Sequence, residues 1–229
     1  MMPLAIDLLG SIVSPARCAG CDAPVGRLIA FCPACRSTVE PARESDARSV
    51  AAFAYGGAIA QAIGRLKYEQ RPDLARPLGD LLWRALAPHA RAVRDAIVVP
   101  VPLHPVRLVE RGFNQAALIA RLIARRLDAP LHPLALARTR DTPRQTALDR
   151  AARRRNVEAA FRVRRPEAVR NRSIVLVDDV STTGATLAAC TQALMSAGAA
   201  NVIPAVVARV WRDDTEIQRS LGAPPHAGV

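Results

Sequence analysis

The chain has 229 residues, of which 50% are hydrophobic, and it carries a formal net charge of +12. This length suits one mid-sized domain with a small addition, and the hydrophobic fraction excludes a chain that is disordered throughout. No stretch approaches the roughly 20 apolar residues of a transmembrane helix, so we expect no membrane span.

The positive charge comes almost entirely from arginine, because Lys67 is the only lysine among the 32 basic residues. Together with the abundant alanine and proline, this bias fits a GC-rich coding sequence. It also predicts attraction to polyanions such as nucleic acid or phosphate-bearing ligands. Charge alone does not separate contact with nucleic acid from an ordinary solvated surface.

The first ten residues have the apolar content of a signal peptide. They lack its basic start, however, and Asp7 lies inside the apolar run. We therefore predict a short amphipathic helix at residues 1–10 and a cytoplasmic location.

Four of the five cysteines form two C-x2-C pairs, Cys18 with Cys21 and Cys32 with Cys35. Two such pairs at this spacing are typical of a structural Zn²⁺ site, in which tight turns direct four thiolates at one tetrahedral ion. Two disulfides are the alternative, which a reducing cytosol disfavours. Because all four ligands are cysteine, no position is open for catalysis.

The middle of the chain alternates apolar runs with turn residues. Residues 41–49 are polar and predict a linker, 50–55 a strand, and about 58–68 and 73–87 two helices. Lys67 and Tyr68 end the first of these helices. They are interpreted either as ordinary surface residues or as ligand-binding residues.

An anion-binding crevice is predicted after the strand at residues 96–102. The loop that follows precedes an amphipathic helix and contains the candidates Leu103, Arg107, Arg111 and Asn114. Ligands of open α/β sheets bind at such carboxyl ends of strands. Surface arginines are the alternative interpretation, and His104, which has no companion acid or cysteine nearby, is expected to have no catalytic role.

Polar and basic residues dominate the next part of the chain. Residues 139–150 predict a mobile loop that leads into a basic helix at 150–156. This segment would close over a phosphorylated substrate, contact a nucleic-acid backbone, or form a solvated helix face. Short strands are predicted on either side of it, at 134–138 and 161–163.

Residues 174–186 combine a strand with a small, hydroxyl-rich loop. Ile174 to Val177 predict a buried parallel strand that ends at Asp178 and Asp179, because a pair of carboxylates does not stay buried unpaired. The next six residues open into a helix and form a predicted sugar-phosphate cradle: Ser181, Thr182, Thr183, Gly184, Ala185 and Thr186. Backbone amides at a helix start bind anions, and the acids can hold ribose hydroxyls or a phosphate-bound Mg²⁺.

The final segments complete the pattern. Cys190 shares an apolar helix face with Leu187 and is expected in the core rather than as a reactive thiol. A last strand is predicted at 201–208, where Pro204 indicates a bulge or a sheet edge. The tail from Arg212 has no periodicity and is expected to be frayed.

Residues 174–186 resemble the phosphoribosyl-pyrophosphate (PRPP) motif of type I phosphoribosyltransferases. Further segments, in order, resemble the ComF family: the two cysteine pairs, 66–68, 99–102, 111–115, the segment at Gln145, 155–157 and 178–184. The resemblance spans nearly the whole chain. It implies an α/β fold with a parallel sheet flanked by helices, as in type I phosphoribosyltransferases, and a small N-terminal four-cysteine zinc ribbon.

The resemblance also implies boundaries and roles. Residues 1–45 would be the zinc-binding head and linker, 46–212 the phosphoribosyltransferase-like domain, and 213–229 a flexible tail. Asp178 and Asp179 would meet the ribose hydroxyls, Thr182 to Thr186 the 5′-phosphate, and the loop with Arg107 and Arg111 the pyrophosphate, with Mg²⁺ as its counterion. No base-binding hood, glutaminase domain or general acid–base residue is recognisable, which leaves the catalytic residues unknown.

Two functions follow from this resemblance. The first is support of DNA uptake in natural transformation, by handling single-stranded DNA in the cytoplasm, with the competence helicase ComFA and the recombination mediator DprA as candidate partners. The alternative is an active phosphoribosyltransferase that uses PRPP in nucleotide or related metabolism. Aromatic residues make up only 3% of the chain, so DNA contacts are expected mainly at phosphates and should depend strongly on salt.

Overall fold

The computed structural model of the chain describes residues 16–26, 29–43, 49–139 and 160–211. Several predicted segments lie outside these residues. They are the amphipathic helix at 1–10, nearly all of the loop at 139–150, the basic helix at 150–156 and the tail from 212. Within the described residues, no helix is both long and apolar enough to cross a membrane.

A four-stranded parallel sheet forms the centre of the fold. Its strands lie in the order β1 (Val50–Ala54), β6 (Asn201–Arg209), β5 (Ser173–Ser181) and β2 (Ile97–Pro100). Val177 of β5 is in register with Ala205 of β6 and with Pro100 of β2. The strands are rich in buried β-branched residues, as expected for a parallel sheet that is covered on both faces.

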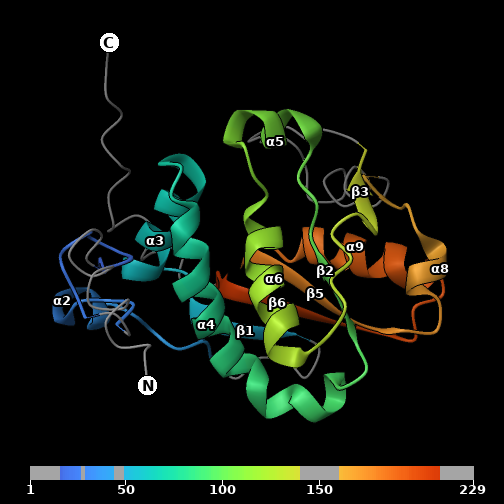
Figure 1. The fold of residues 1–229 in the computed structure, drawn as a ribbon, viewed down its shortest axis with the longest axis horizontal. Coiled ribbons are helices and arrows are strands. Elements are labelled where there is room, and N and C mark those ends of the chain that lie inside the picture. The colour runs from blue at the N-terminus through green and yellow to red at the C-terminus, as the bar shows by residue number, and fades with distance from the viewer. Residues whose placement is uncertain (1–15, 27–28, 44–48, 140–159, 212–229) are drawn as a thin grey trace, which may run out of the picture.

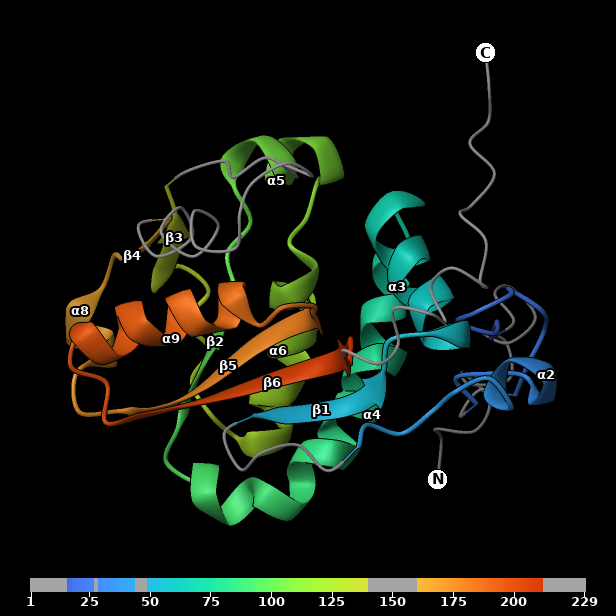
Figure 2. The same cartoon turned by 180° about the vertical axis from the view of Figure 1, so that it is seen from behind.

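Helices cover both faces of this sheet (Figures 1 and 2). On one face lie α4 (Ala75–Leu86) and α6 (Gln115–Leu127), with the 3₁₀ segment η2 (Ala87–Val93) between α4 and β2; on the other lies α9 (Ala185–Ser196). Side chains of β5 alternate between the two cores. Val175 and Val177 belong to the α4/α6 core, whereas Ile174 and Leu176 belong to the α9 core.

The remaining elements are short or peripheral. They are α2 (Pro33–Arg36), α3 (Gly57–Tyr68), η1 (Pro72–Leu74), α8 (Pro166–Val169) and an antiparallel pair, β3 (Leu136–Arg138) with β4 (Phe161–Val163). Within the described residues, the predicted strands and helices therefore exist where the apolar patterns placed them. The expected fold class, a parallel sheet flanked by helices, is confirmed.

One predicted loop is partly a helix. Residues Pro105–Arg111 form α5, which lies near the carboxyl ends of the strands (Figure 1). Two signals in the sequence support it: Pro105 occupies the first turn, where its missing N–H costs nothing, and Gly112 ends the helix at φ 77°. The crevice residues Arg107 and Arg111 thus lie on a helix rather than on an irregular loop.

The expectation of a sheet edge at Pro204 is wrong. Strand β6 lies between β1 and β5, and Pro204 is buried opposite Leu176 of β5. Pairing between β6 and β1 begins at Ala205, one residue later. In the described residues, no residue of β1 pairs with Pro204, so the missing N–H of proline breaks no hydrogen bond to β1.

The cysteine-rich head packs directly on α3. Its buried residues Cys18, Ala19, Phe31 and Cys35 share one apolar cluster with the helices on the α4/α6 face. Polar contacts join the same surfaces. Thr38 Oγ1 accepts a 3.0 Å hydrogen bond from the N–H of Ala58, and so caps a helix that begins with glycine.

Charged side chains connect the head to the C-terminal end of α3 and to the segment that follows it. Arg65 donates to the carbonyl oxygens of Cys18 and Ala19 and lies 2.6 Å from Asp22, which also pairs with Arg71 at 2.9 Å. Hydrogen bonds from these two arginines lower the pKa of Asp22 to about 2. The start of the predicted linker is hydrogen-bonded to β1, because the backbone N–H of Ala42 donates to the carbonyl oxygen of Ala52. The head is thus joined to the sheet domain by apolar, ionic and backbone contacts.

Candidate functional site

The acid pair lies inside strand β5 and not beyond its end. Asp178 is 8% exposed and Asp179 only 2%, and the strand continues to Ser181. The prediction that the strand ends at the acids is therefore wrong. Its premise, that carboxylates are not buried unpaired, still holds, because each acid has a compensating environment. Adjacent residues of a strand point to opposite faces, so the two carboxyl groups have different neighbours.

Asp179 faces the α4/α6 side and is held by two side chains. Lys67, near the end of α3, forms an ion pair with its Oδ2, and Gln115, the first residue of α6, donates a 3.0 Å hydrogen bond to Oδ1. Burial alone would lower the pKa of Lys67, but the charge and hydrogen bond of Asp179 outweigh it and raise the pKa. Lys67 is therefore a charged partner in the site, and its interpretation as a surface residue is wrong.

Asp178 faces the α9 side of the sheet and has a different environment. Its Oδ1 accepts a 2.9 Å hydrogen bond from the backbone N–H of Asp179. Burial raises the pKa of Asp178 well above its usual range, and the nearby Asp179 raises it further. This favours the protonated form. Cys190 is fully buried in the same core, where burial also raises its pKa well above the usual value, so the prediction of a core thiol is confirmed.

The hydroxyl-rich loop lies between β5 and α9, at the carboxyl end of the strand. Ser181 is buried in the last position of β5, whereas Thr182 and Thr183 are exposed. Gly184 adopts φ 75°, and a Cβ at this glycine would meet no atom within 4 Å, so open space lies beside the backbone. The turn thus presents the loop to solvent.

The first turn of α9 supplies backbone donors to the same place. The first backbone bond at the start of α9 runs from Ala188 to Gly184, and the amide of Ala185 approaches Thr183 Oγ1 at 3.4 Å. The amides of Thr186 and Leu187 precede that bond and lack a partner four residues back. Amides in this position, together with the helix dipole, form an anion-binding site.

The structure separates the residues of the crevice that was predicted after residues 96–102. Arg107 and Glu110 form an exposed ion pair on α5 at 2.9 Å. Asn114 caps α6: its Oδ1 accepts from the amides of Ala116 and Ala117, and its Nδ2 donates to Val101 O at 3.0 Å. The Asn114 amide therefore has a structural role as a helix cap, and a ligand would have to compete with these hydrogen bonds. Leu103 and His104 are half-buried beside α5, and the described residues offer His104 Nδ1 no hydrogen-bond partner.

Arg111 alone of these crevice residues connects with the acid pair. It donates a 2.5 Å hydrogen bond to Gln115 Oε1, and the Gln115 amide in turn donates to Asp179. Its guanidinium carbon also lies 5.7 Å from the centre of the Tyr68 ring. Sequence reasoning missed the roles of Gln115 and Lys67, since their contacts join segments far apart in the chain. The only signal in the sequence was that both residues lie in segments that resemble the ComF family, 66–68 and 111–115.

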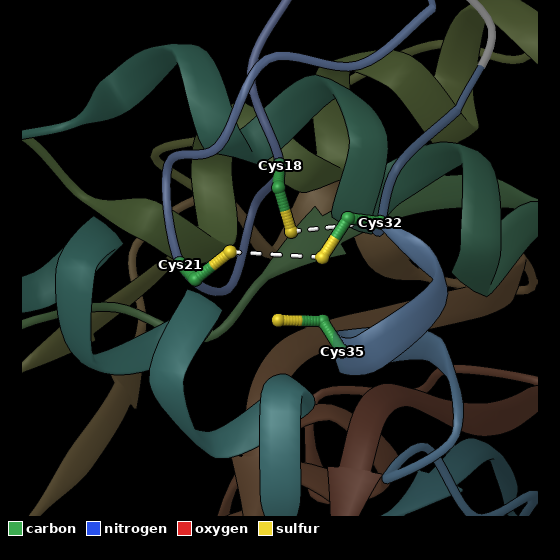
Figure 3. Close-up of side chains that lie close together, drawn as sticks. All are labelled: Cys18, Cys21, Cys32 and Cys35. Carbon is green, nitrogen blue, oxygen red and sulfur yellow. Dashed lines mark hydrogen bonds between the residues drawn. The ribbon is translucent and has the colours of Figure 1, made fainter.

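The four cysteines of the head converge on one point (Figure 3). Their ligand atoms all lie within 4.8 Å of one another, and Cys21 Sγ is 3.7 Å from Cys32 Sγ. This is far longer than a disulfide, and it matches the spacing of about 3.8 Å between thiolates around a tetrahedral ion at about 2.3 Å. The backbone N–H of Cys32 also donates to Cys18 Sγ at 3.3 Å. The cluster can hold a metal ion.

The chain is similar to several known proteins. The family model of the phosphoribosyl transferase domain matches residues 114–219. The DNA utilization protein YhgH of Escherichia coli O157:H7 is 34% identical over 213 residues, which cover 88% of this chain and 91% of that protein. Competence protein F of Haemophilus influenzae is 35% identical over 130 residues, 55% of this chain and 56% of that protein.

Two further similarities complete the comparison. Competence protein ComFC of Bacillus subtilis is 35% identical over 105 residues, 45% of this chain and 40% of that protein. The crystal structure of TT1426 from Thermus thermophilus superposes with a TM-score of 0.37 and 22% identity, over 68% of this chain and 86% of that one. The similarity to YhgH over most of the chain, together with the matches to competence proteins F and ComFC, shows that the chain belongs to the ComF family.

Proposed function

We propose that the protein handles single-stranded DNA in DNA uptake and that it binds a PRPP-like sugar phosphate at the carboxyl edge of its sheet. The observation that carries the proposal is the loop from Thr182 to Thr186, in which both first threonines are exposed. Its Gly184 lies beside open space, and the amides at the start of the helix suit a phosphate. The names of the relatives, a DNA utilization protein and two competence proteins, support the DNA part.

Within the sugar-phosphate site, the loop and the acids differ in access. Thr182 and Thr183 are exposed, whereas both oxygens of Asp179 already contact protein groups. A 5′-phosphate would therefore bind the loop directly. A ribose hydroxyl or a ligand-borne Mg²⁺ would have to displace Lys67 or Gln115 to reach Asp179.

The DNA part of the proposal is electrostatic. A net charge of +12 on 229 residues, nearly all from arginine, favours contact with a phosphate backbone. Arg121 and Arg125 are exposed one turn apart on α6 and are candidates for such contacts. A competence helicase such as ComFA and a mediator such as DprA are the protein partners that this role would bring together on the same DNA.

Zinc is the proposed metal of the head. Four thiolates without an oxygen or nitrogen ligand favour a soft or borderline ion in a closed tetrahedral site. The site would be structural, because the head has too few residues for a core of its own and shares the core of α3. We place the head and linker at 1–45, the phosphoribosyltransferase-like domain at 46–212 and the tail at 213–229.

Binding of single-stranded oligonucleotides should weaken steeply with salt. Each neutralised phosphate contributes a slope of about −0.7 in log K against log salt for single strands. A site with several such contacts should lose at least about tenfold in affinity between roughly 50 and 200 mM salt. Fluorescence anisotropy with a labelled oligonucleotide measures this. An affinity that is unchanged over this range, or no binding at low salt, would contradict the DNA role.

An active phosphoribosyltransferase is the second candidate function, favoured by the match of residues 114–219 to the phosphoribosyl transferase domain. Measurements of PRPP binding and of pyrophosphate release on one protein preparation distinguish the two candidate functions. Pyrophosphate released from PRPP when a candidate acceptor is present would support turnover, whereas binding of PRPP without release supports a ligand site in a DNA-handling protein.

A further inference from the structure

Tyr68 is an unusually accessible aromatic residue at the edge of the site. It ends α3 and is 66% exposed, which makes it the most exposed aromatic residue among those that the structure describes. Burial of aromatic rings is strongly favourable, and this chain contains few of them. An exposed ring beside a ligand site therefore suggests a surface that another flat group covers.

Arg111 gives this ring a cationic partner. Its guanidinium lies 5.7 Å from the ring centre, at the range of a cation–π contact, yet the ring stays largely accessible. The guanidinium is also fixed, because it donates to Gln115, which donates to Asp179. A planar cation held by a partly buried chain of hydrogen bonds loses less freedom when a ligand binds.

We propose that Tyr68 and Arg111 form a stacking platform for a nucleobase. The proposal rests on the proposed function and extends it by naming the chemical group that meets this edge of the site. Every nucleobase has a flat π-face that stacks on tyrosine or on an arginine plane, so such a platform binds bases without reading their sequence. The chain Arg111–Gln115–Asp179 joins the platform to the acid of the sugar-phosphate site. The low aromatic content therefore does not exclude base stacking at this one place.

An abasic oligonucleotide separates stacking from phosphate contacts. We expect the wild-type protein to bind a thymidine oligonucleotide about tenfold more tightly than an abasic strand of the same length, at equal salt. Tyr68→Leu should lose that preference and keep its affinity for the abasic strand, while Tyr68→Phe should retain the preference. Arg111→Lys keeps the charge but loses the plane, so the preference should fall. Met195→Ala, a change of an exposed residue on α9, is the matched control.

A second arm uses a mononucleotide and identifies the source of the base. Thymidine monophosphate is compared with deoxyribose 5-phosphate, in wild type and in Tyr68→Leu. A Tyr68-dependent preference in the oligonucleotide arm supports the platform with DNA as the source. If the oligonucleotides do not bind, but the protein prefers thymidine monophosphate to deoxyribose 5-phosphate and this preference depends on Tyr68, the DNA role is wrong. The platform is then supported as a binding site for free nucleotides. A base preference that Tyr68→Leu leaves unchanged, or no base preference in either arm, overturns the platform.

Discussion

Removing the proposed zinc from the four-cysteine cluster is expected to unfold the head and to lower the melting temperature by about 10 °C or more. Structural zinc sites in zinc-finger peptides contribute about 10–16 kcal/mol of apparent binding free energy, and in a chain of this length each kcal/mol corresponds to about 2–4 °C. The effect should reach α3, because Cys18 and Cys35 share its core and Thr38 caps its first turn. Metal analysis and thermal unfolding, before and after chelation, measure both parts.

Single substitutions locate the effect in the cluster. Cys21→Ser changes the exposed member of the four and should lower both the zinc content and the melting temperature. Cys190→Ala also removes a thiol, but from the core beside α9, and should leave about one zinc per chain. A metal-free protein that keeps the native melting temperature would show that the head does not depend on a metal.

Breaking the ion pair between Lys67 and Asp179 is expected to cost about 3–5 kcal/mol of unfolding free energy, because it leaves a buried charge without its partner. Lys67→Met should have the larger effect. It leaves Asp179, whose side chain is 3% exposed, unpaired beside Asp178, whereas the Lys67 side chain is 20% exposed and can still approach water when Asp179→Leu removes its partner. Urea unfolding of both variants gives the two free energies.

The double variant Lys67→Met with Asp179→Leu tests the coupling. Its loss of stability should be smaller than the sum of the two single losses, because neither charge remains buried. Arg126→Met is the control, since Arg126 and Asp80 form an ion pair of similar length at an exposed position, worth at most about 1 kcal/mol. Single variants as stable as this control, or fully additive losses, would contradict a buried, coupled pair.

Local patterns were sufficient to predict the strands, most helices and the cysteine cluster. The run from Ile174 to Val177 is apolar because both faces of β5 are buried, and the two C-x2-C pairs bring their thiolates together by short turns. Helix α5 was missed although Pro105 and Gly112 signal its two ends. The signals were present, but the special residues of this segment suggested a loop.

Contacts between distant segments could not be predicted in the same way. The burial of Asp179 depends on Lys67 of α3 and on Gln115 of α6, and nothing local to the acid pair indicates either partner. The strand order, with β6 between β1 and β5, likewise depends on how the helices cross the sheet. The sequence therefore predicted which residues form the site better than it predicted how they neutralise one another.

The most direct test of the sugar-phosphate site is a calorimetric titration of PRPP with Mg²⁺ into the zinc-loaded protein. The comparison is with a variant that carries both Thr182→Val and Thr183→Val, which removes two exposed hydroxyls and keeps the side-chain shape. Ser196→Ala, an exposed hydroxyl at the other end of α9, is the control. We predict that wild type and control bind PRPP alike and that the double variant binds at least about tenfold more weakly, since hydrogen bonds to charged groups contribute about 1.5–3 kcal/mol each. Equal affinity in all three proteins, or no binding by the folded wild type, would contradict the site.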